Sequence, residues 1–142
     1  ENISESKLQS LIFFFEKYYS KNISIVKSEE SELMKLTCNS FYSVKIQFFT
    51  EIYLLCQKLN LSYDTIIDLV LKNGWVNEHH TKIPGHDGKV SYGGACFPKD
   101  TNAFYNYDKS FTVLRETIAI NNAMRSVYEK DERELEQNVN YE

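Results

Sequence analysis

Hydrophobic residues recur at helical spacing along most of the chain. Between about residues 4 and 20, the apolar residues that would share one helix face are Leu8, Leu11, Ile12, Phe15 and Tyr18 or Tyr19. Residues 22–27 alternate between polar and apolar side chains, a pattern typical of a short strand. An isolated strand is not stable in water, so we expect this strand to belong to a sheet that the rest of the chain does not supply.

A long helix is predicted from about residue 28 to about residue 59, a stretch without proline or glycine. Ser28 or Ser31 can cap it, and Glu29, Glu30 and Glu32 suit its positive end. The apolar residues that keep the helical period are Leu33, Leu36, Phe41, Val44, Phe48, Ile52, Leu55 and Leu59. A helix of this length exceeds the usual range of about 8–20 residues and indicates the spine of a helical domain or a subunit interface.

The remaining pattern also favours helices, so the predicted fold class is mainly α. A helix is expected from Ser62 or Asp64 to Lys72, where Asn73-Gly74 stops it. Residues 75–95 form a long loop, followed by helices over 98–107 and 110–130. The last of these would turn inward Leu114, Ile118, Met124 and Val127 or Tyr128. Residues 131–142 are polar, and we expect them to fray.

Composition narrows the possible partners and the compartment. A net charge of −4 on 142 residues, without a basic stripe, argues against nucleic-acid binding. The apolar runs are too short to cross a membrane. Three cysteines without close spacing favour a reducing compartment, and we predict a cytoplasmic protein. The first residue is Glu1 rather than methionine, which suggests a piece of a longer chain.

The segment 93–100, Gly-Gly-Ala-Cys-Phe-Pro-Lys-Asp, is the main chemical signal in the sequence. Two glycines allow positive φ or close approach to a ligand, and Pro98 suits the first position of a helix. Cys96 would then lie just outside a helix N-terminus and near Lys99, and both features favour the nucleophilic thiolate. An ordinary Gly-Gly turn beside a free cysteine is the alternative.

Lys35 and Asn39 lie four residues apart on the predicted long helix and would share one face. Such a pair offers a cation and an amide donor to one oxyanion, although a solvated lysine beside a neutral asparagine has the same spacing. Cys38 and Cys56 lie in the same helix and are expected to be small buried residues.

The residues of the loop also suggest two other chemistries, a metal site and a Cys–His hydrolase. Glu78-His79-His80 with His86-Asp87 contains metal-binding residue types, but the usual ligand spacings are missing, so no metal site is predicted. A Cys–His hydrolase would pair Cys96 with His80 or His86, which leaves Lys35, Asn39 and Asp100 without a role.

Several segments in the same order resemble one enzyme family. Residues 32–41 (Glu-Leu-Met-Lys-Leu-Thr-Cys-Asn-Ser-Phe) resemble the central helix of the UDP-glucose and GDP-mannose dehydrogenases. Residues 84–89 and 92–100 resemble their substrate loop and cysteine motif, and 118–125 resemble the helix that follows. The cysteine motif is the most specific of these segments.

The resemblance implies a three-part enzyme of which this chain carries the central, dimerising part. Residues 1–27 would be the last helix and strand of an NAD-binding Rossmann domain, 28–130 the helical central domain and 131–142 a polar tail. The dinucleotide fingerprint G-x-G-x-x-G is missing here, so NAD would be bound mainly by a domain outside this chain. The chain alone is therefore expected to form a dimer without turning over substrate.

The reaction implied by the resemblance is the NAD-dependent four-electron oxidation of a sugar C6 alcohol to a carboxylate through a cysteine thiohemiacetal and thioester. Carried over to this sequence, Cys96 would be the nucleophile, while Lys35 and Asn39 would stabilise charge on oxygen. Asp100 would help to activate water. Tyr92 and Gly93 would line the nucleotide-sugar site together with Lys35 and Asn39, and Lys99 would approach the cofactor.

One departure from the family pattern leaves the substrate open. Family members often carry an arginine in an Asp-x-Arg-Ile-Gly stretch before the loop, and it reaches into the partner subunit's site. The matching residues 73–77 (Asn-Gly-Trp-Val-Asn) contain no arginine. The sugar could be glucose, mannose or an N-acetyl-hexosamine, and a helical dimerisation module without chemistry of its own is the alternative from another class.

Overall fold

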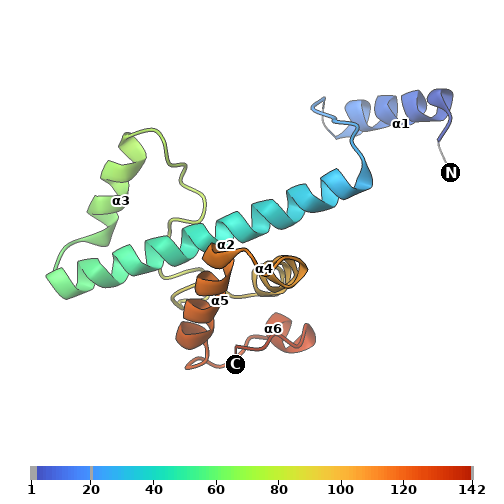
Figure 1. The fold of residues 1–142 in the computed structure, drawn as a ribbon. Coiled ribbons are helices and arrows are strands. Elements are labelled where there is room, and N and C mark those ends of the chain that lie inside the picture. The colour runs from blue at the N-terminus through green and yellow to red at the C-terminus, as the bar shows by residue number, and fades with distance from the viewer. Residues whose placement is uncertain (1–2, 20, 142) are drawn as a thin grey trace. The chain divides into compact units, whose positions relative to one another are not determined.

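The computed structural model describes residues 3–19 and 21–141, and these residues form helices and no strand. The helices are α1 (Glu5–Tyr18), α2 (Ser28–Leu59), α3 (Tyr63–Lys72), α4 (Cys96–Tyr107), α5 (Thr112–Arg125) and α6 (Glu132–Glu136), drawn in Figure 1. The prediction of a mainly α fold is confirmed. The chain divides into two compact units, Glu1–Glu32 and Leu33–Glu142.

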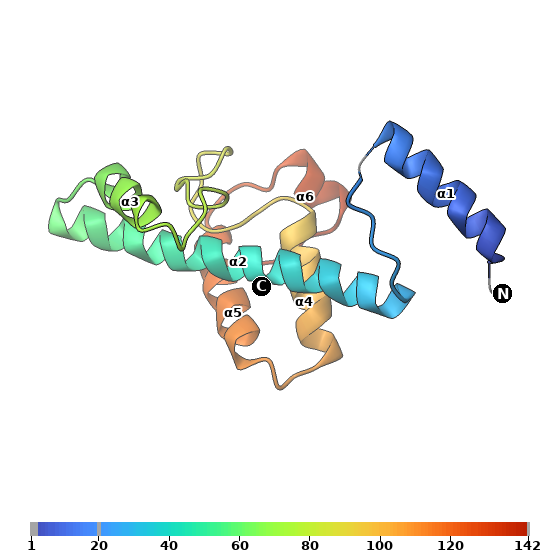
Figure 2. The same cartoon turned by 90° about the horizontal axis from the view of Figure 1, so that it is seen from above.

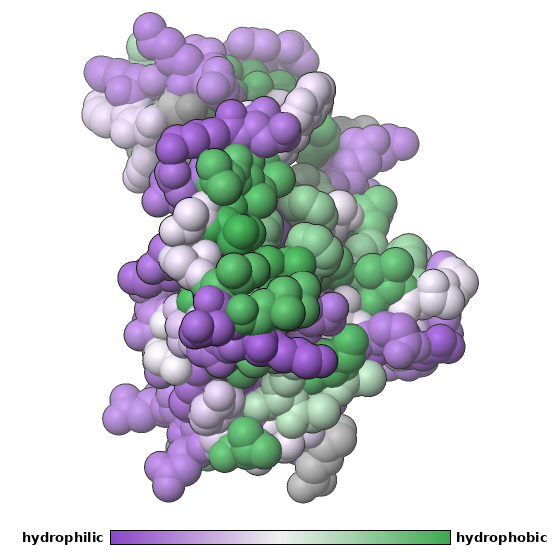
Figure 3. All heavy atoms as spheres, turned by 90° about the vertical axis from the view of Figure 1, so that its left-hand side faces the viewer, coloured by the Kyte–Doolittle hydropathy of each residue, from purple (hydrophilic) through white to green (hydrophobic). Residues whose placement is uncertain are grey.

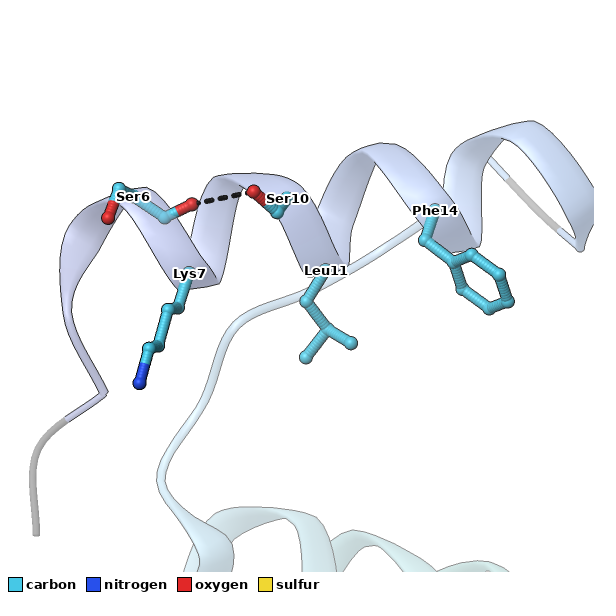
Figure 4. Close-up of a pocket in the computed structure, with 5 residues that line it drawn as sticks. All are labelled: Ser6, Lys7, Ser10, Leu11 and Phe14. Carbon is cyan, nitrogen blue, oxygen red and sulfur yellow. Dashed lines mark hydrogen bonds between the residues drawn. The ribbon is translucent and has the colours of Figure 1, made fainter.

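The first unit consists of α1 and the segment that leads into α2. The predicted helix is present, but the predicted strand over residues 22–27 is wrong, because these residues have no regular structure. A strand needs a neighbouring strand for its backbone hydrogen bonds, and the described residues contain none. No residue of α1 is buried. Ser6, Lys7, Ser10, Leu11 and Phe14 line a shallow open pocket on α1 itself (Figure 4), far from any candidate chemistry in sequence.

The second unit is built on α2, a helix of 32 residues. Its buried face is mostly small or polar and consists of Ser40, Ser43, Ile46, Gln47, Phe49, Thr50 and Cys56. Ile46, Phe49 and Cys56 form the core together with Tyr63 of α3 and with Ile83 and Tyr92 of the long loop. Both views show α4 and α5 crossing the same side of α2 (Figures 1 and 2).

The connection between α3 and α4 is the long loop that the sequence predicts. Ser62 caps α3 by accepting a hydrogen bond from the amide of Thr65 at 3.2 Å. Tyr63 donates to the carbonyl of Thr81 at 2.6 Å. The Lys45 ammonium donates to the carbonyls of Asn77 and His79 at 2.8 and 2.6 Å. These contacts hold an irregular segment against α2 and α3.

The last two predicted helices are present with shifted ends. α4 begins at Cys96 rather than Pro98, because a proline without an N–H is tolerated anywhere in the first turn. α5 ends at Arg125 rather than near residue 130, so Val127 is 78% exposed and the expectation that Val127 or Tyr128 points inward is wrong. Leu114 and Ile118 are buried as predicted, and Arg125 is buried as well.

The expectation that residues 131–142 fray is wrong for the described residues 131–141. Asp131 and Glu134 form a capping box that starts α6, and Val139 and Tyr141 are each only 6% exposed. Glu134 is itself buried, and it accepts hydrogen bonds from Arg125, from Tyr141 and from the amide of Gly94. The polar composition of residues 131–141 therefore gave no sign that the segment packs on the domain through the buried carboxylate of Glu134.

The contact between α2 and α4 yields a stability prediction. Ser43 and Thr101 are fully buried, and their hydroxyl oxygens lie 2.9 Å apart. We expect Thr101→Val to lower the free energy of unfolding by about 1 kcal/mol, because it removes one buried hydrogen bond while Ser43 keeps its bond to the Asn39 carbonyl. Urea unfolding measures this change. Thr37→Val, the same substitution at an exposed position of α2, is the control, and equal stability of the two variants would contradict the prediction.

Candidate active site

Cys96 is the first residue of α4 and is exposed. The residue before it, Ala95, already has helical backbone angles (φ −82°, ψ −41°) and gives no side-chain cap. The sequence analysis expected the thiol just outside the helix. The structure places it in the first turn of α4. At this position it still lies near the free N–H groups and the positive end of the helix dipole.

Asp100 connects the start of α4 to α2. Its side chain is 6% exposed, and its Oδ2 accepts a hydrogen bond of 2.6 Å from the Asn39 amide. The Lys35 ammonium lies 3.6 Å from the same oxygen, and the Lys99 ammonium lies 3.4 Å from Oδ1. Lys35, Asn39 and Asp100, which the sequence analysis grouped, thus meet at one carboxylate, together with Lys99.

Cys96 and Asp100 lie one turn apart on α4, so they share a helix face with Cβ atoms about 5–6 Å apart. The side chains of Lys35 and Asn39 reach this face from α2 through their contacts with Asp100. The direct convergence of the Cys96 sulfur with the Lys35 amine and the Asn39 amide stays a prediction.

The electrostatics of the cluster keep Asp100 ionised. Burial by itself would raise the pKa of Asp100, but the hydrogen bond from Asn39 and the charges of Lys99 and Lys35 outweigh it and lower that pKa. A carboxylate with a lowered pKa is a weak base. In this state Asp100 serves mainly to hold two donors, the Lys35 ammonium and the Asn39 amide, at the thiol-bearing end of α4.

The Gly93-Gly94 turn has two different requirements for glycine. Gly94 has φ +72°, the left-handed conformation that glycine adopts without strain. At Gly93 a Cβ atom would lie 2.0 Å from the Arg125 guanidinium nitrogen Nη2, so no larger residue fits. The close approach expected from the sequence is present at Gly93, but its partner is an arginine of α5.

A cavity of about 420 Å³ lies beside this turn. Tyr92, Gly93, Gly94 and Phe97 contribute to its wall. Its charged lining consists of two basic and two acidic side chains, Lys82, Arg133, Asp87 and Asp131. The Tyr92 side chain itself is 2% exposed and belongs to the core, where burial raises its pKa.

The histidines of the long loop are the basis of the two competing chemistries, a metal site and a Cys–His hydrolase. In the part of the chain that the structure describes, no three His, Cys, Asp or Glu side chains are close enough together to hold a metal ion. The His80 ring packs against the rings of Tyr42 and Phe97, with centroids 4.7 and 5.4 Å away. Burial lowers the pKa of His80, helped by the charges of Lys45 and His79. His80 thus serves the packing of the loop on α2 and α4.

The residues that sequence analysis did not select are Asp87, Arg125 and Glu134. The Arg125 side chain is 1% exposed and pairs with Asp87 at 2.8 Å and with Glu134 at 2.9 Å. The spacing of Asp131 and Glu134 is that of a capping box, a signal that could have identified α6. No local pattern indicates that Glu134 reaches the Gly94 amide.

The residues of this chain do not fit a Rossmann-type NAD site. No three of the glycines Gly74, Gly85, Gly88, Gly93 and Gly94 have the fingerprint spacing, and the described residues form no strand for it to follow. No helix of the described residues is long and apolar enough to span a membrane. The three cysteines, Cys38, Cys56 and Cys96, are unpaired, and of the first two only Cys56 is buried as expected.

Comparison with known proteins places the chain in a family. The model of the UDP-glucose/GDP-mannose dehydrogenase family, central domain, matches residues 29–130. UDP-glucose 6-dehydrogenase YwqF of Bacillus subtilis (strain 168) is 29% identical over 101 residues, which are 68% of this chain and 22% of YwqF. UDP-glucose 6-dehydrogenase of Rhizobium meliloti (strain 1021) is 33% identical over 95 residues, 64% of this chain and 21% of the relative.

GDP-mannose 6-dehydrogenase of Pseudomonas savastanoi pv. phaseolicola is 29% identical over 97 residues, 68% of this chain and 21% of the relative. The chain thus spans about a fifth of the length of these curated relatives. No solved structure matches it significantly. The family model covers most of the chain and includes Lys35, Asn39, Cys96 and Asp100. The chain therefore belongs to the UDP-glucose/GDP-mannose dehydrogenase family, and residues 29–130 are its central domain.

Proposed function

We propose that this chain is the central domain of a nucleotide-sugar 6-dehydrogenase of the UDP-glucose to UDP-glucuronate type, and that Cys96 is its nucleophile. The observation that carries the proposal is the meeting of Asn39 and Lys35 at Asp100, one turn after an exposed cysteine at a helix start. Relatives named as GDP-mannose 6-dehydrogenases leave GDP-mannose as the second candidate substrate. A UDP-N-acetyl-hexosamine is a third.

The proposed chemistry of Cys96 is covalent capture of an aldehyde. The thiolate adds to the C6 carbonyl carbon, a C–S bond forms, and the carbonyl oxygen takes up the charge and then a proton to give a thiohemiacetal. Oxidation of this adduct leaves a thioester, which water hydrolyses to the carboxylate and the free thiol. Covalent attachment keeps the reactive aldehyde from leaving between the two oxidations.

Lys35 and Asn39 would stabilise the oxygen that becomes charged in these steps. Asn39 now donates a hydrogen bond to Asp100, and Lys35 forms an ion pair with it. The Lys35 side chain is 63% exposed, so a substrate oxygen at the same place can replace one of these contacts. Loss of a donor would raise the basicity of Asp100, which fits its proposed help to the hydrolytic water. Tyr92 and Gly93 would line the sugar-nucleotide end of the site beside Lys82 and Arg133.

The cofactor belongs to another part of the enzyme in this proposal. Both oxidations need a hydride acceptor, which the family resemblance implies to be NAD⁺. Because this chain does not fit a dinucleotide site, we propose that it is inactive alone and that Lys99, 54% exposed beside Asp100, faces the cofactor in the intact enzyme. A cytoplasmic location, proposed from the cysteines, agrees with their unpaired state.

We also propose that α2 forms a homodimer. Met34, Phe41, Phe48 and Leu55 are seven residues apart and between 48% and 60% exposed. A heptad spacing of apolar side chains on a long helix is typical of helix pairs. Further exposed leucines, Leu59, Leu61 and Leu69, follow at the end of α2 and around α3. Figure 3 views the molecule from the side of α3 and the end of α2 and shows hydrophobic side chains gathered there.

The nucleophile is tested in the intact enzyme that carries this domain. Cys96→Ser is expected to lower kcat for NADH formation from UDP-glucose by roughly 10³-fold or more, since the covalent step is lost. Cys38→Ser is the matched control and is expected to keep the rate. A Cys96→Ser enzyme with the wild-type rate would contradict the assignment of Cys96 as nucleophile. A higher rate with GDP-mannose than with UDP-glucose would change only the identity of the proposed substrate.

The charge of Asp100 is tested by the pH dependence of stability. Its lowered pKa means that the ionised carboxylate stabilises the fold above the ordinary value of 3.8, and that this contribution is lost as the pH falls through the lower folded-state value. We expect Asp100→Asn to reduce the free energy of unfolding by about 1 kcal/mol near pH 7. The difference should stay constant down to about pH 4 and shrink below it.

Urea unfolding from pH 3 to 8 measures this difference. Asp68→Asn is the control, because Asp68 pairs with Lys72 on the surface of α3 with 61% of its side chain exposed. A stabilising effect of Asp100→Asn, or a pH profile equal to that of the control, would contradict the proposed electrostatics.

The proposed dimer is tested by measuring the molecular mass of the chain in solution. Phe48→Asp places a charge in the middle of the exposed apolar row of α2 and is expected to halve the mass measured by light scattering at micromolar concentration. Tyr107→Asp is the matched control, since Tyr107 is an 87% exposed aromatic residue at the end of α4. A wild-type chain of monomeric mass, or a Phe48→Asp chain that stays dimeric, would exclude this interface.

A further inference from the structure

The backbone just before Cys96 is held by side chains from three different parts of the second unit. The amide of Ser91 donates to the Thr50 hydroxyl of α2 at 3.2 Å. The amide of Tyr92 donates to the Asn121 side chain of α5 at 3.1 Å. The amide of Gly94 donates to the Glu134 carboxylate of α6 at 3.1 Å. The last of these contacts lies two residues before the thiol.

Glu134 is a buried acceptor with several donors. Its side chain is 1% exposed. Besides the hydrogen bond from the Gly94 amide, Oε1 accepts one from Arg125 Nη2 at 2.9 Å and one from the Tyr141 hydroxyl at 2.6 Å. Oε2 accepts from the Asp131 amide at 3.0 Å. Burial alone would raise the pKa of Glu134, but the hydrogen bonds from Tyr141, Asp131, Arg125 and Gly94 lower it to about 2. The carboxylate is therefore charged throughout the range in which enzymes work.

The ion pair of Arg125 and Glu134 lies directly on the glycine turn. A Cβ atom at Gly93 would be 2.0 Å from Arg125 Nη2 and 2.7 Å from Glu134 Oε1. Asp87, on the long loop, holds the other guanidinium nitrogen at 2.8 Å. The pair thus fixes Gly93 by contact and Gly94 by a hydrogen bond, while Gly94 takes the positive φ that leads the chain into α4.

Asp100 ties the first turn of α4 to α2, but no side chain caps the helix N-terminus itself. Ala95 provides no side-chain cap, and Cys96 is exposed at the surface. A buried ion pair adds little net stability by itself, because the cost of removing the charges from water offsets their attraction. A hydrogen bond that one particular amide donates to a charged acceptor does fix the position of that amide.

We propose that Glu134, held by Arg125 and Tyr141, is a positioning residue for Cys96, because it fixes the Gly94 amide and thereby the place of the thiol at the start of α4. The meaning of this role for catalysis rests on the proposed function of Cys96. The positioning itself is a property of the chain and can be measured without turnover.

The test compares Glu134→Gln, which keeps the side-chain shape and removes the charge, with Glu132→Gln, an exposed glutamate of the same helix. Two readouts are used on the 142-residue chain: hydrogen exchange of the Gly94 amide by NMR, and the rate of Cys96 alkylation by iodoacetamide, separated from Cys38 and Cys56 by peptide mass spectrometry. Both report on the segment around the thiol and not on global folding, which circular dichroism checks.

In Glu134→Gln we expect faster exchange at Gly94 and alkylation of Cys96 slower by about fivefold, because a neutral amide oxygen is a weaker acceptor for the Gly94 amide than the carboxylate. Access is not limiting, because Cys96 is already exposed, so loss of its fixed place at the helix start lowers reactivity. Glu132→Gln should leave both readouts at the wild-type values. A folded Glu134→Gln chain with wild-type alkylation of Cys96 overturns the proposal.

Tyr141→Phe is the second variant, because it removes only one hydroxyl that donates to Glu134. If Glu134→Gln does not fold, a change of both readouts in Tyr141→Phe supports the positioning role and no change in either overturns it. In the intact enzyme, Glu134→Gln should lower kcat more than it changes KM for UDP-glucose. Should Cys96→Ser keep its activity, the proposed function fails, yet exchange and alkylation still decide whether Glu134 positions residue 96.

Discussion

The crossing of α2 and α4 depends on a buried carboxylate. Asp100 accepts from Asn39, and the neighbouring Thr101 lies against Ser43 one turn further along α2. Two consecutive residues of α4 thus meet two residues of α2 that are one turn apart. This pairing fixes both the angle and the position of the helices, and it decides that the face of α4 bearing Cys96 and Asp100 is the face that Lys35 and Asn39 can reach.

A second buried carboxylate, Glu134, acts on the other side of the thiol. Asp100 holds the helix that follows Cys96, and Glu134 holds the glycine turn that precedes it. The charges differ in their surroundings: Asp100 faces two exposed lysines, whereas Glu134 is enclosed with Arg125 and Tyr141. The first is open to exchange with a ligand, and the second is suited to holding a fixed backbone.

The distribution of residues on α2 explains why the helix can serve two surfaces. Its buried face toward α4 and the loop is rich in serine, threonine and glutamine, which make hydrogen bonds such as Ser91 to Gln47 at 2.6 Å. Its exposed face carries the larger apolar residues, among them Phe41 and Phe48. The described residues leave this face uncovered, and it is the surface of the proposed dimer.

The sequence by itself determined the helices from α1 to α5 and the long loop, because helical periodicity and capping residues are local properties of the chain. The grouping of Lys35, Asn39, Cys96 and Asp100 rested on a resemblance of short motifs to a family. The alternating pattern of residues 22–27 predicted a strand that is not present, since strand formation depends on a partner strand elsewhere. Only the tertiary structure decided which face of α2 is buried, that Gly93 makes room for Arg125, and that the polar segment 131–141 packs through Glu134. The physical reason is that a buried charge is stable only where distant donors converge on it, and a local pattern does not record that convergence.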